Sequence, residues 1–248
     1  MGVLVEICTG SVDDVLESEK GGANRVELCS ALALGGLTPS PGSIGETKRL
    51  SKLPAMVMIR PRGGGFAYSD VEFSTMERDM EIAGELGADG FVFGILKGDG
   101  TIDARRTARL VKRASGLPTV FHRAFDVAPE PFDALRAIID LGCTRLLTSG
   151  QKRKSLDGAE LIRALIEFAE NRIEVMPGGG IRTHNLAEVV RLTGCRQVHL
   201  AAHKSTVDTS VWANPAIVFG SETAPAEDRV DIIDTSIVAA IVREATLL

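Results

Sequence analysis

The sequence is poor in aromatic residues and has no strongly basic segment. Aromatic side chains make up 4% of the 248 residues, with a single tryptophan and a single tyrosine. That leaves little material for stacking nucleic-acid bases. Acidic residues outnumber basic ones by 33 to 28, for a formal net charge of −5. A mildly acidic chain lacks the positive surface that binds phosphate backbones, so we expect no nucleic-acid partner.

Long hydrophobic runs and paired cysteines are also missing. No apolar run approaches the ~20 residues that cross a bilayer, and the first residues lack the charged start of a signal peptide. We therefore expect no membrane association. No CxxC pair occurs among the four cysteines, Cys8, Cys29, Cys143 and Cys195. In a leaderless chain of this size, such cysteines are typical of reduced thiols in a cytoplasmic protein.

Several motifs of catalysis and cofactor binding are absent. No GxGxxG follows the first predicted strand, so no nucleotide cofactor is expected. The chain contains neither the GxSxG of a serine nucleophile elbow nor the HExxH of a zinc protease. Its lysines fall in predicted loops and helices rather than on strands, which disfavours a Schiff-base aldolase.

What the chain does contain is one unit repeated eight times: a short apolar run, a loop rich in glycine or proline, and a helical stretch. The apolar runs cover residues 3–8, 25–29, 55–60, 90–94, 118–122, 145–148, 172–176 and 197–200. Hydrophobic residues amount to 44%, enough for a sizeable core. Strands that alternate with helices indicate parallel pairing through crossover helices.

This spacing predicts an α/β fold, a single-domain (β/α)8 TIM barrel over residues 1–248, rather than a doubly wound open sheet. Residues 204–230 interrupt the pattern, because they separate the eighth strand from the last helix and are less regular. Loops this long are uncommon in compact domains. We expect an irregular insertion that carries an extra strand or an oligomer contact.

Alternation along the strands predicts a charged barrel interior. Outward-facing residues should be branched and apolar, as Val3, Val5 and Ile7 are. The opposite parity directs these ionisable residues inward: Glu6, Arg25, Glu27, Arg60, His122, Glu174 and His199. We expect Arg25 and Glu174, nearer the N-terminal ends of their strands, to form a structural ion pair. The others lie at or near the C-terminal ends, where barrel enzymes place their active sites.

Two interpretations of the inward-facing charges remain open at this point. Burying an unpaired charge is costly, so these groups either pair internally or line a wet pocket. Internal pairing would join Arg60 to Glu6 or Glu27. A wet pocket would bind a small polar ligand.

The loops after the strands add candidate anion-binding and acid/base groups. Arg60 and Arg62, followed by three glycines, present a cationic surface suited to carboxylate or phosphate. His122, Arg123 and Asp126 bring an imidazole, a cation and a carboxylate within five residues. The alternative for this last loop is a brace in which Arg123 pairs with Asp126.

Later loops offer a second anion site. Ser149 follows the sixth strand, and Gly178, Gly179 and Gly180 follow the seventh, just before a helix that begins near Thr183. Glycine amides at a helix N-terminus bind anions, and this is the usual phosphate position of a TIM barrel. The alternative is a tight turn that needs positive φ angles.

Two cysteines share the inward parity at the ends of the first two strands. Cys8 and Cys29 are soft ligands that can hold copper(I), or else they are small buried hydrophobes. Cys143 and Cys195 precede the sixth and eighth strands, at the opposite face, and are expected to be structural.

Seven ordered blocks occur between about residues 3 and 203: 6–8, 25–29, 35–40, 58–64, 121–126, 147–150 and 176–180. They resemble the copper homeostasis protein CutC family. The resemblance implies a cytoplasmic TIM barrel, a homo-oligomer, linked to copper tolerance and proposed to bind copper(I), with no assigned reaction. The chain departs from the family at residues 199–202, His-Leu-Ala-Ala, where relatives often have His-Ser/Cys-Ser-Ala. Cys8 and Cys29 are left as the candidate metal ligands.

Two main functional hypotheses result. The first is a CutC-like protein of copper homeostasis. The second is a TIM-barrel enzyme, an isomerase, lyase or hydrolase, acting on a small anionic or phosphorylated metabolite at the C-terminal barrel mouth. Its candidate catalytic residues are Glu6, Glu27, Arg60, His122 and Asp126. Its candidate anion-binding residues are Arg62, Arg123, Ser149, Gly178, Gly179, Gly180 and His199. The carboxylates and imidazole would suit a divalent metal better than copper(I). A scaffold without catalysis, acting through its helical surfaces, is a third hypothesis.

Overall fold

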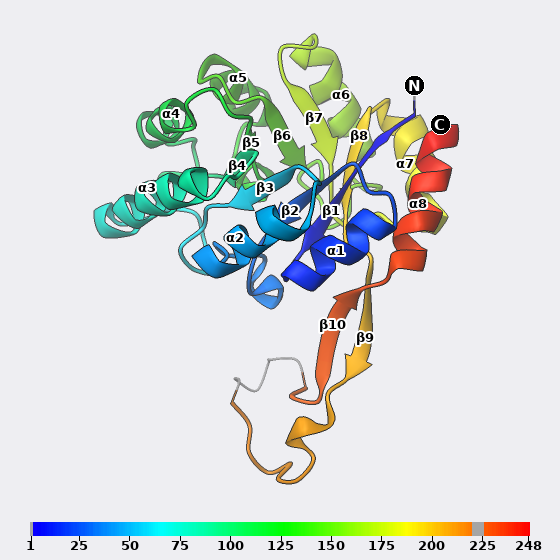
Figure 1. Ribbon diagram of the computed structural model, residues 1–248. Helices are drawn as coiled ribbons and strands as arrows, with labels where there is room; N and C mark the ends of the chain where they lie inside the picture. The colour runs from blue at the N-terminus through cyan, green and yellow to red at the C-terminus, as the bar shows by residue number, and fades with distance from the viewer. Residues whose placement is uncertain (1, 220–225) are drawn as a thin grey trace.

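The computed structural model describes residues 2–219 and 226–248 (Figure 1). Eight parallel strands form its centre: β1 (Leu4–Thr9), β2 (Arg25–Leu28), β3 (Ala55–Met58), β4 (Gly90–Phe93), β5 (Thr119–Phe121), β6 (Arg145–Thr148), β7 (Glu174–Pro177) and β8 (Gln197–Leu200). They are hydrogen-bonded in the order β7-β6-β5-β4-β3-β2-β1-β8, and a parallel bridge between Gly178 and His199 joins the two ends. The predicted (β/α)8 barrel is confirmed.

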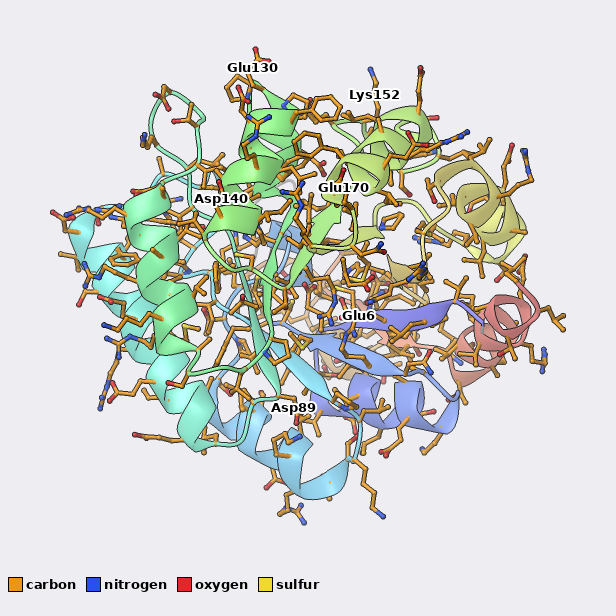
Figure 2. The ribbon with its side chains drawn as sticks, turned by 90° about the horizontal axis from the view of Figure 1, so that it is seen from above. Glu6, Asp89, Glu130, Asp140, Lys152 and Glu170 are labelled. Atoms are coloured by element: carbon orange, nitrogen blue, oxygen red, sulfur yellow. The ribbon has the colours of Figure 1, made fainter. Side chains whose placement is uncertain are left out.

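Eight helices surround the strands: α1 (Val12–Lys20), α2 (Pro41–Leu50), α3 (Asp70–Glu85), α4 (Ala104–Arg113), α5 (Pro131–Asp140), α6 (Ala159–Ala169), α7 (Leu186–Thr193) and α8 (Thr235–Leu247). Local chemistry sets where they begin. Ser69 and Glu72 form a reciprocal capping box at the start of α3. Seen from above, Glu6 lies within the ring of strands, whereas Glu130 and Lys152 lie at the periphery (Figure 2).

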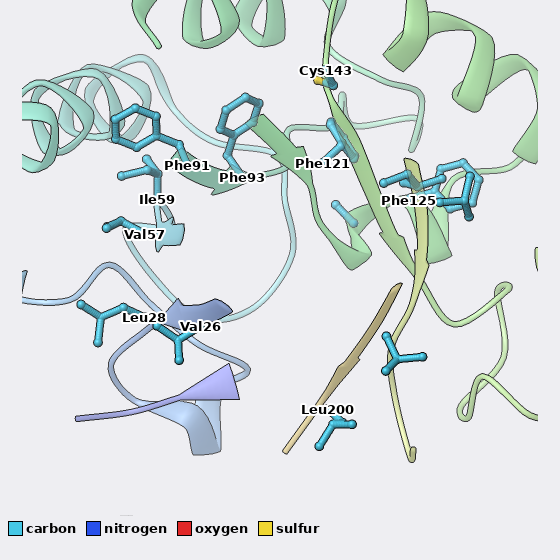
Figure 3. Close-up of a cluster of buried hydrophobic side chains, with 14 of the residues drawn as sticks. Val26, Leu28, Val57, Ile59, Phe91, Phe93, Phe121, Phe125, Cys143 and Leu200 are labelled. Carbon is cyan, nitrogen blue, oxygen red and sulfur yellow. The ribbon is translucent and has the colours of Figure 1, made fainter. Parts of the chain in front are cut away.

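The strand residues divide into an outer and an inner set. Outward residues such as Val26, Val57 and Phe91 pack between the strands and the helices (Figure 3). The inner set forms a separate small cluster: Cys29, Met56, Met58, Val92, Val120, Leu147 and Met176. Because successive side chains of a strand point to opposite faces, the predicted parity is confirmed for these strands.

The insertion before the last helix contains two strands. β9 (His203–Val207) pairs antiparallel with β10 (Arg229–Ile233), and together they form an arm that projects from the barrel (Figure 1). Its base is held to α1 because the Ile233 amide donates to Asp14 Oδ1 at 2.8 Å. The extra strand expected in 204–230 is therefore present, although residues 220–225 lie outside the described residues. The oligomer contact stays a prediction.

None of the helices in residues 2–219 and 226–248 has both the length and the apolar composition needed to cross a bilayer.

Candidate metal and ligand site at the barrel mouth

A cavity of about 670 Å³ lies at the C-terminal ends of the strands. Its polar walls include Cys8, Glu27, Arg60, His122, Asp126 and His199, and its apolar walls include Leu32, Met58, Phe66 and Leu147. The arm contributes His203 and Asp231. Parallel strands of a closed barrel end at the same rim, so residues far apart in sequence meet here.

Glu6 is the buried centre of the inner charges, although it does not itself line the cavity. The strand register places it beside Arg25 on β2 and beside His199 on β8. Arg25 Nε donates to Oε2 of Glu6, and Nδ1 of His199 lies 2.8 Å from Oε1. Burial alone would raise the pKa of Glu6, but the His199 hydrogen bond and the Arg25 charge lower it to about 2. Glu6 is therefore a carboxylate at neutral pH.

The expected partnership of Arg25 and Glu174 is wrong. Arg25 pairs with Glu6, and its Nη2 donates to Gln197 Oε1 at 2.9 Å. Glu174 is the exposed first residue of β7. Strand β1, beside β2, and strand β8, beyond β1, supply closer acceptors to Arg25 than β7 does.

Two thiols converge on a second glutamate. The sulfur atoms of Cys8 and Cys29 each lie 3.5 Å from Oε2 of Glu27. His199 Nε2 lies 3.7 Å from the same oxygen. One potential ligand atom each from Cys8, Glu27 and His199 falls within 4.8 Å of the others. This cluster brings together two sulfur donors, an imidazole and a carboxylate.

Burial and the charges within this cluster shift the pKa values of its ionisable groups. Burial raises the pKa of Glu27 to about 8, with further contributions from the Cys8 and Glu6 charges. A hydrogen bond from Cys29 lowers the pKa of the Cys8 thiol, and the same contact raises that of Cys29. Burial would lower the pKa of His199, but the Glu27 charge and the hydrogen bonds to Cys8 and Glu6 raise it well above its usual value. Cys8 is thus the more acidic of the two thiols.

Arg60 does not form the predicted ion pair with Glu6 or Glu27. Its Nη1 donates to the carbonyls of Leu34 at 2.8 Å and Gly36 at 3.0 Å, and its Nη2 donates to the carbonyl of Gly64 at 2.8 Å. The alternative of internal salt bridges through Arg60 is therefore wrong. The guanidinium instead holds together the loops that follow β2 and β3.

His122 is the N-cap residue of a short 3-10 helix, η2 (Arg123–Val127), and Asp126 lies within that helix. The Ala124 amide donates to Nδ1 of His122 at 3.1 Å. Burial and the nearby Arg60 charge lower the pKa of His122 to about 3, so the ring is neutral. Asp126 pairs with Arg123 at 2.8 Å and also accepts from the Ser149 amide. Of the two interpretations of this segment, the geometry supports the loop braced by the pair of Arg123 and Asp126.

Among the predicted anion-binding residues, only Arg123 and His199 line the cavity. Arg62 is paired with Glu72 instead. The Ser149 hydroxyl donates to Asp126. The described structure thus brings together four of the five catalytic candidates at the cavity wall, while most anion candidates lie elsewhere.

The glycines after β7 are engaged in local structure. The Gly178 amide donates to the Thr148 carbonyl, and the Gly179 carbonyl accepts from the Ser155 amide. Gly179 and Gly180 have φ angles of 107° and 74°, which other residues rarely adopt. This is the geometry of the tight turn that the sequence left open as an alternative.

Sequence reasoning missed Phe66, His203 and Asp231. The ring of Phe66 lies over the Arg60 guanidinium, 5.2 Å from Cζ. The sequence feature that could have identified Phe66 is its position directly after three glycines. His203 and Asp231 reach the wall through the pairing of β9 with β10, which no local pattern indicated.

The CutC family model matches residues 3–204, which include every strand of the barrel. The chain belongs to the CutC family. The CutC family protein of Treponema denticola is 47% identical over 230 residues, covering 93% of this chain and 94% of the relative. The human copper homeostasis protein cutC homolog is 42% identical, covering 95% and 86% respectively.

Solved structures agree with this assignment. CutC from Streptococcus agalactiae superimposes with a TM-score of 0.77 at 40% identity, covering 80% of this chain and 98% of that one. Phosphoribosylanthranilate isomerase from Pyrococcus furiosus superimposes with a TM-score of 0.58 at 14% identity and covers 99% of this chain and 100% of that one. At that identity the likeness shows the barrel fold alone.

Proposed function

We propose that this CutC-family protein binds copper(I) in the cytoplasm through Cys8 and Cys29. The observation that carries the proposal is the convergence of both sulfur atoms on Oε2 of Glu27 at the end of β1 and β2. Adjacent strands place the two thiols side by side, and His199 stands next to them. The role in copper homeostasis follows relatives that carry this name.

The donor set fits a soft ion. Thiolates select copper(I), whereas carboxylate and imidazole alone suit harder divalent ions. Oε1 of Glu27 is buried without a hydrogen-bond partner among the described residues. Copper(I) is here the cargo, held by Cys8 and Cys29, and His199 lies beside them.

The cytoplasmic location rests on the state of the cysteines. All four are free thiols in the structure, with no disulfide among the described residues. Free thiols and copper(I) are both maintained in reducing compartments.

Anaerobic titration tests the proposal. The fully reduced protein competes with a chromophoric chelator for copper(I), alongside the double variant Cys8→Ser/Cys29→Ser. The matched control is Cys143→Ser/Cys195→Ser, which removes two buried thiols distant in sequence from the cluster. We expect the first double variant to lose more than about 100-fold in affinity, beyond the ~10–100-fold typical of outer-shell changes. Equal affinity of all three proteins would exclude these ligands.

The alternative, a barrel enzyme for a small anionic metabolite, stays a prediction. The observation in its favour is the size of the cavity, since about 670 Å³ far exceeds the space for one ion. Its test compares turnover of a candidate metabolite by the wild-type protein and by Glu27→Gln, which should abolish that turnover.

A further inference from the structure

Two buried N–H groups on the wall of this cavity, in addition to Nε2 of His203 and Oε1 of Glu27, have no hydrogen-bond partner among the described residues. They are Nε of Arg60 and Nε2 of His122, and each residue is only 5% exposed. An unmade buried hydrogen bond costs about 1–3 kcal/mol, and more when the group is charged. Native proteins leave few such groups, and each one calls for an explanation.

Both atoms are donors. Nδ1 of His122 accepts from the Ala124 amide, which places the proton of the neutral ring on Nε2. Three of the four N–H bonds on the terminal nitrogens of Arg60 are directed at loop carbonyls, and Nε–H has no partner among the described residues. Among the ion pairs of the described residues, none joins Arg60 to a carboxylate, although it is a buried cation. Two donors and an unneutralised positive charge therefore call for an anionic acceptor.

Phe66 covers both groups. Its ring lies 5.2 Å from Cζ of Arg60, and its centroid lies 5.0 Å from that of the His122 ring. The backbone at Phe66 is anchored, because its carbonyl accepts from the Leu96 amide at 3.0 Å. The half-buried side chain can therefore turn away while the loop stays in place.

We propose that this cavity binds a small organic carboxylate, whose two oxygens accept from Arg60 Nε–H and His122 Nε2–H once the Phe66 side chain rotates aside. Two donors match the two oxygens of a carboxylate better than the three of a phosphate. Met58, Leu147 and Leu32 supply an apolar wall for the organic part. The inference does not depend on copper binding.

The test uses copper-free, reduced protein and a matched pair of probes: 3-phenylpropanoate and its uncharged isostere 3-phenylpropanamide. Calorimetry gives the affinities, and the side-chain Nε–H signal of Arg60 in ¹H–¹⁵N spectra, assigned by its loss in Arg60→Lys, reports contact at that atom. We expect the carboxylate to bind at least about tenfold more tightly than the amide and to shift this signal. Inorganic phosphate should compete poorly.

Arg62→Lys is the matched control, since Arg62 lies two residues away on the same loop but pairs with Glu72. Arg60→Lys should weaken carboxylate binding about tenfold or more, whereas Arg62→Lys should leave it unchanged. Equal binding of the acid and the amide would overturn the inference even if Arg60→Lys does not fold. Where that variant folds and assigns the signal, an unmoved Arg60 Nε–H signal would overturn it as well. Phosphate that competes as well as the carboxylate would overturn the choice of ligand class.

Discussion

Nδ1 of His199 on β8 lies 2.8 Å from Oε1 of Glu6 on β1. These are the last and the first strands of the barrel, and they pair in parallel. The second oxygen of Glu6 accepts from Arg25 on β2. One carboxylate thus ties three neighbouring strands together beneath the thiol cluster. The other ring nitrogen of His199 faces Glu27. His199 therefore contacts both the buried pair of Glu6 and Arg25 and the cluster of Glu27 and the thiols.

Replacing Glu6 should destabilise the barrel strongly. Glu6→Gln leaves the buried Arg25 guanidinium without its carboxylate, and breaking a buried pair in this way costs about 3–5 kcal/mol. Denaturant unfolding at pH 7 measures the loss. The control is Glu46→Gln, which removes an exposed pair with Arg49 on α2 and should leave stability nearly unchanged, because exposed ion pairs contribute little.

The same variant should show a defined pH dependence. The pKa of Glu6 is about 2 when folded, below its ordinary 4.5, so its contribution is present above pH 4.5 and is lost as the pH falls towards 2. The gap in unfolding free energy between wild type and Glu6→Gln should therefore narrow on acidification across this window. A gap of constant size would contradict the assigned charge state.

His122 should contribute to acid sensitivity. Its pKa is about 3 when folded, below its ordinary 6.5, so between these values the unfolded chain takes up a proton that the folded protein does not. Stability is lost as the pH falls through this range. His122→Asn keeps an acceptor for the Ala124 amide. This variant should be less stable than the wild type at pH 7.5, but its free energy of unfolding should fall less than that of the wild type between pH 6.5 and 4. A slope in His122→Asn equal to that of the wild type would contradict this assignment.

Gly94 should tolerate no side chain. A Cβ at this position would clash with Nδ1 of His122 and would lie 2.8 Å from Cβ of Ala124. Gly94→Ala must therefore displace the imidazole, at a cost of roughly 1–3 kcal/mol, and should speed hydrogen exchange at the Ala124 amide. Gly98→Ala meets nothing within 4 Å, so an equal effect there would argue against this clash.

Asp126 should act as an anchor for the loop after β6. It accepts from Thr148 Oγ1 and from the amides of Ser149 and Gln151. Asp126→Ala should cost about 2–4 kcal/mol, since several donors lose one buried acceptor, and should raise amide exchange at residues 149 and 151. Asp133→Ala, at the exposed start of α5, is the comparison. Unchanged exchange in Asp126→Ala would refute the anchoring role.

Much of this architecture could be predicted because it depends on local patterns. Alternation along a strand has a period of two residues, so inward and outward sets can be read directly, as for Val26 and Glu27. Parallel strands end at one rim, which is why Cys8, Glu27 and His199 could be expected to meet. The insertion was recognised by its irregularity, but its pairing as a hairpin was not.

The sequence by itself determined the barrel, the parity of its strands and the set of polar groups at its mouth. Only the tertiary structure decided which partner each group takes: Arg25 bonds Glu6, Arg60 bonds loop carbonyls, and Phe66 covers the two donors left over. The physical reason is that periodicity is local, whereas a hydrogen bond needs its donor and acceptor within about 3 Å. That proximity depends on the register of neighbouring strands and on the path of loops that are distant in sequence.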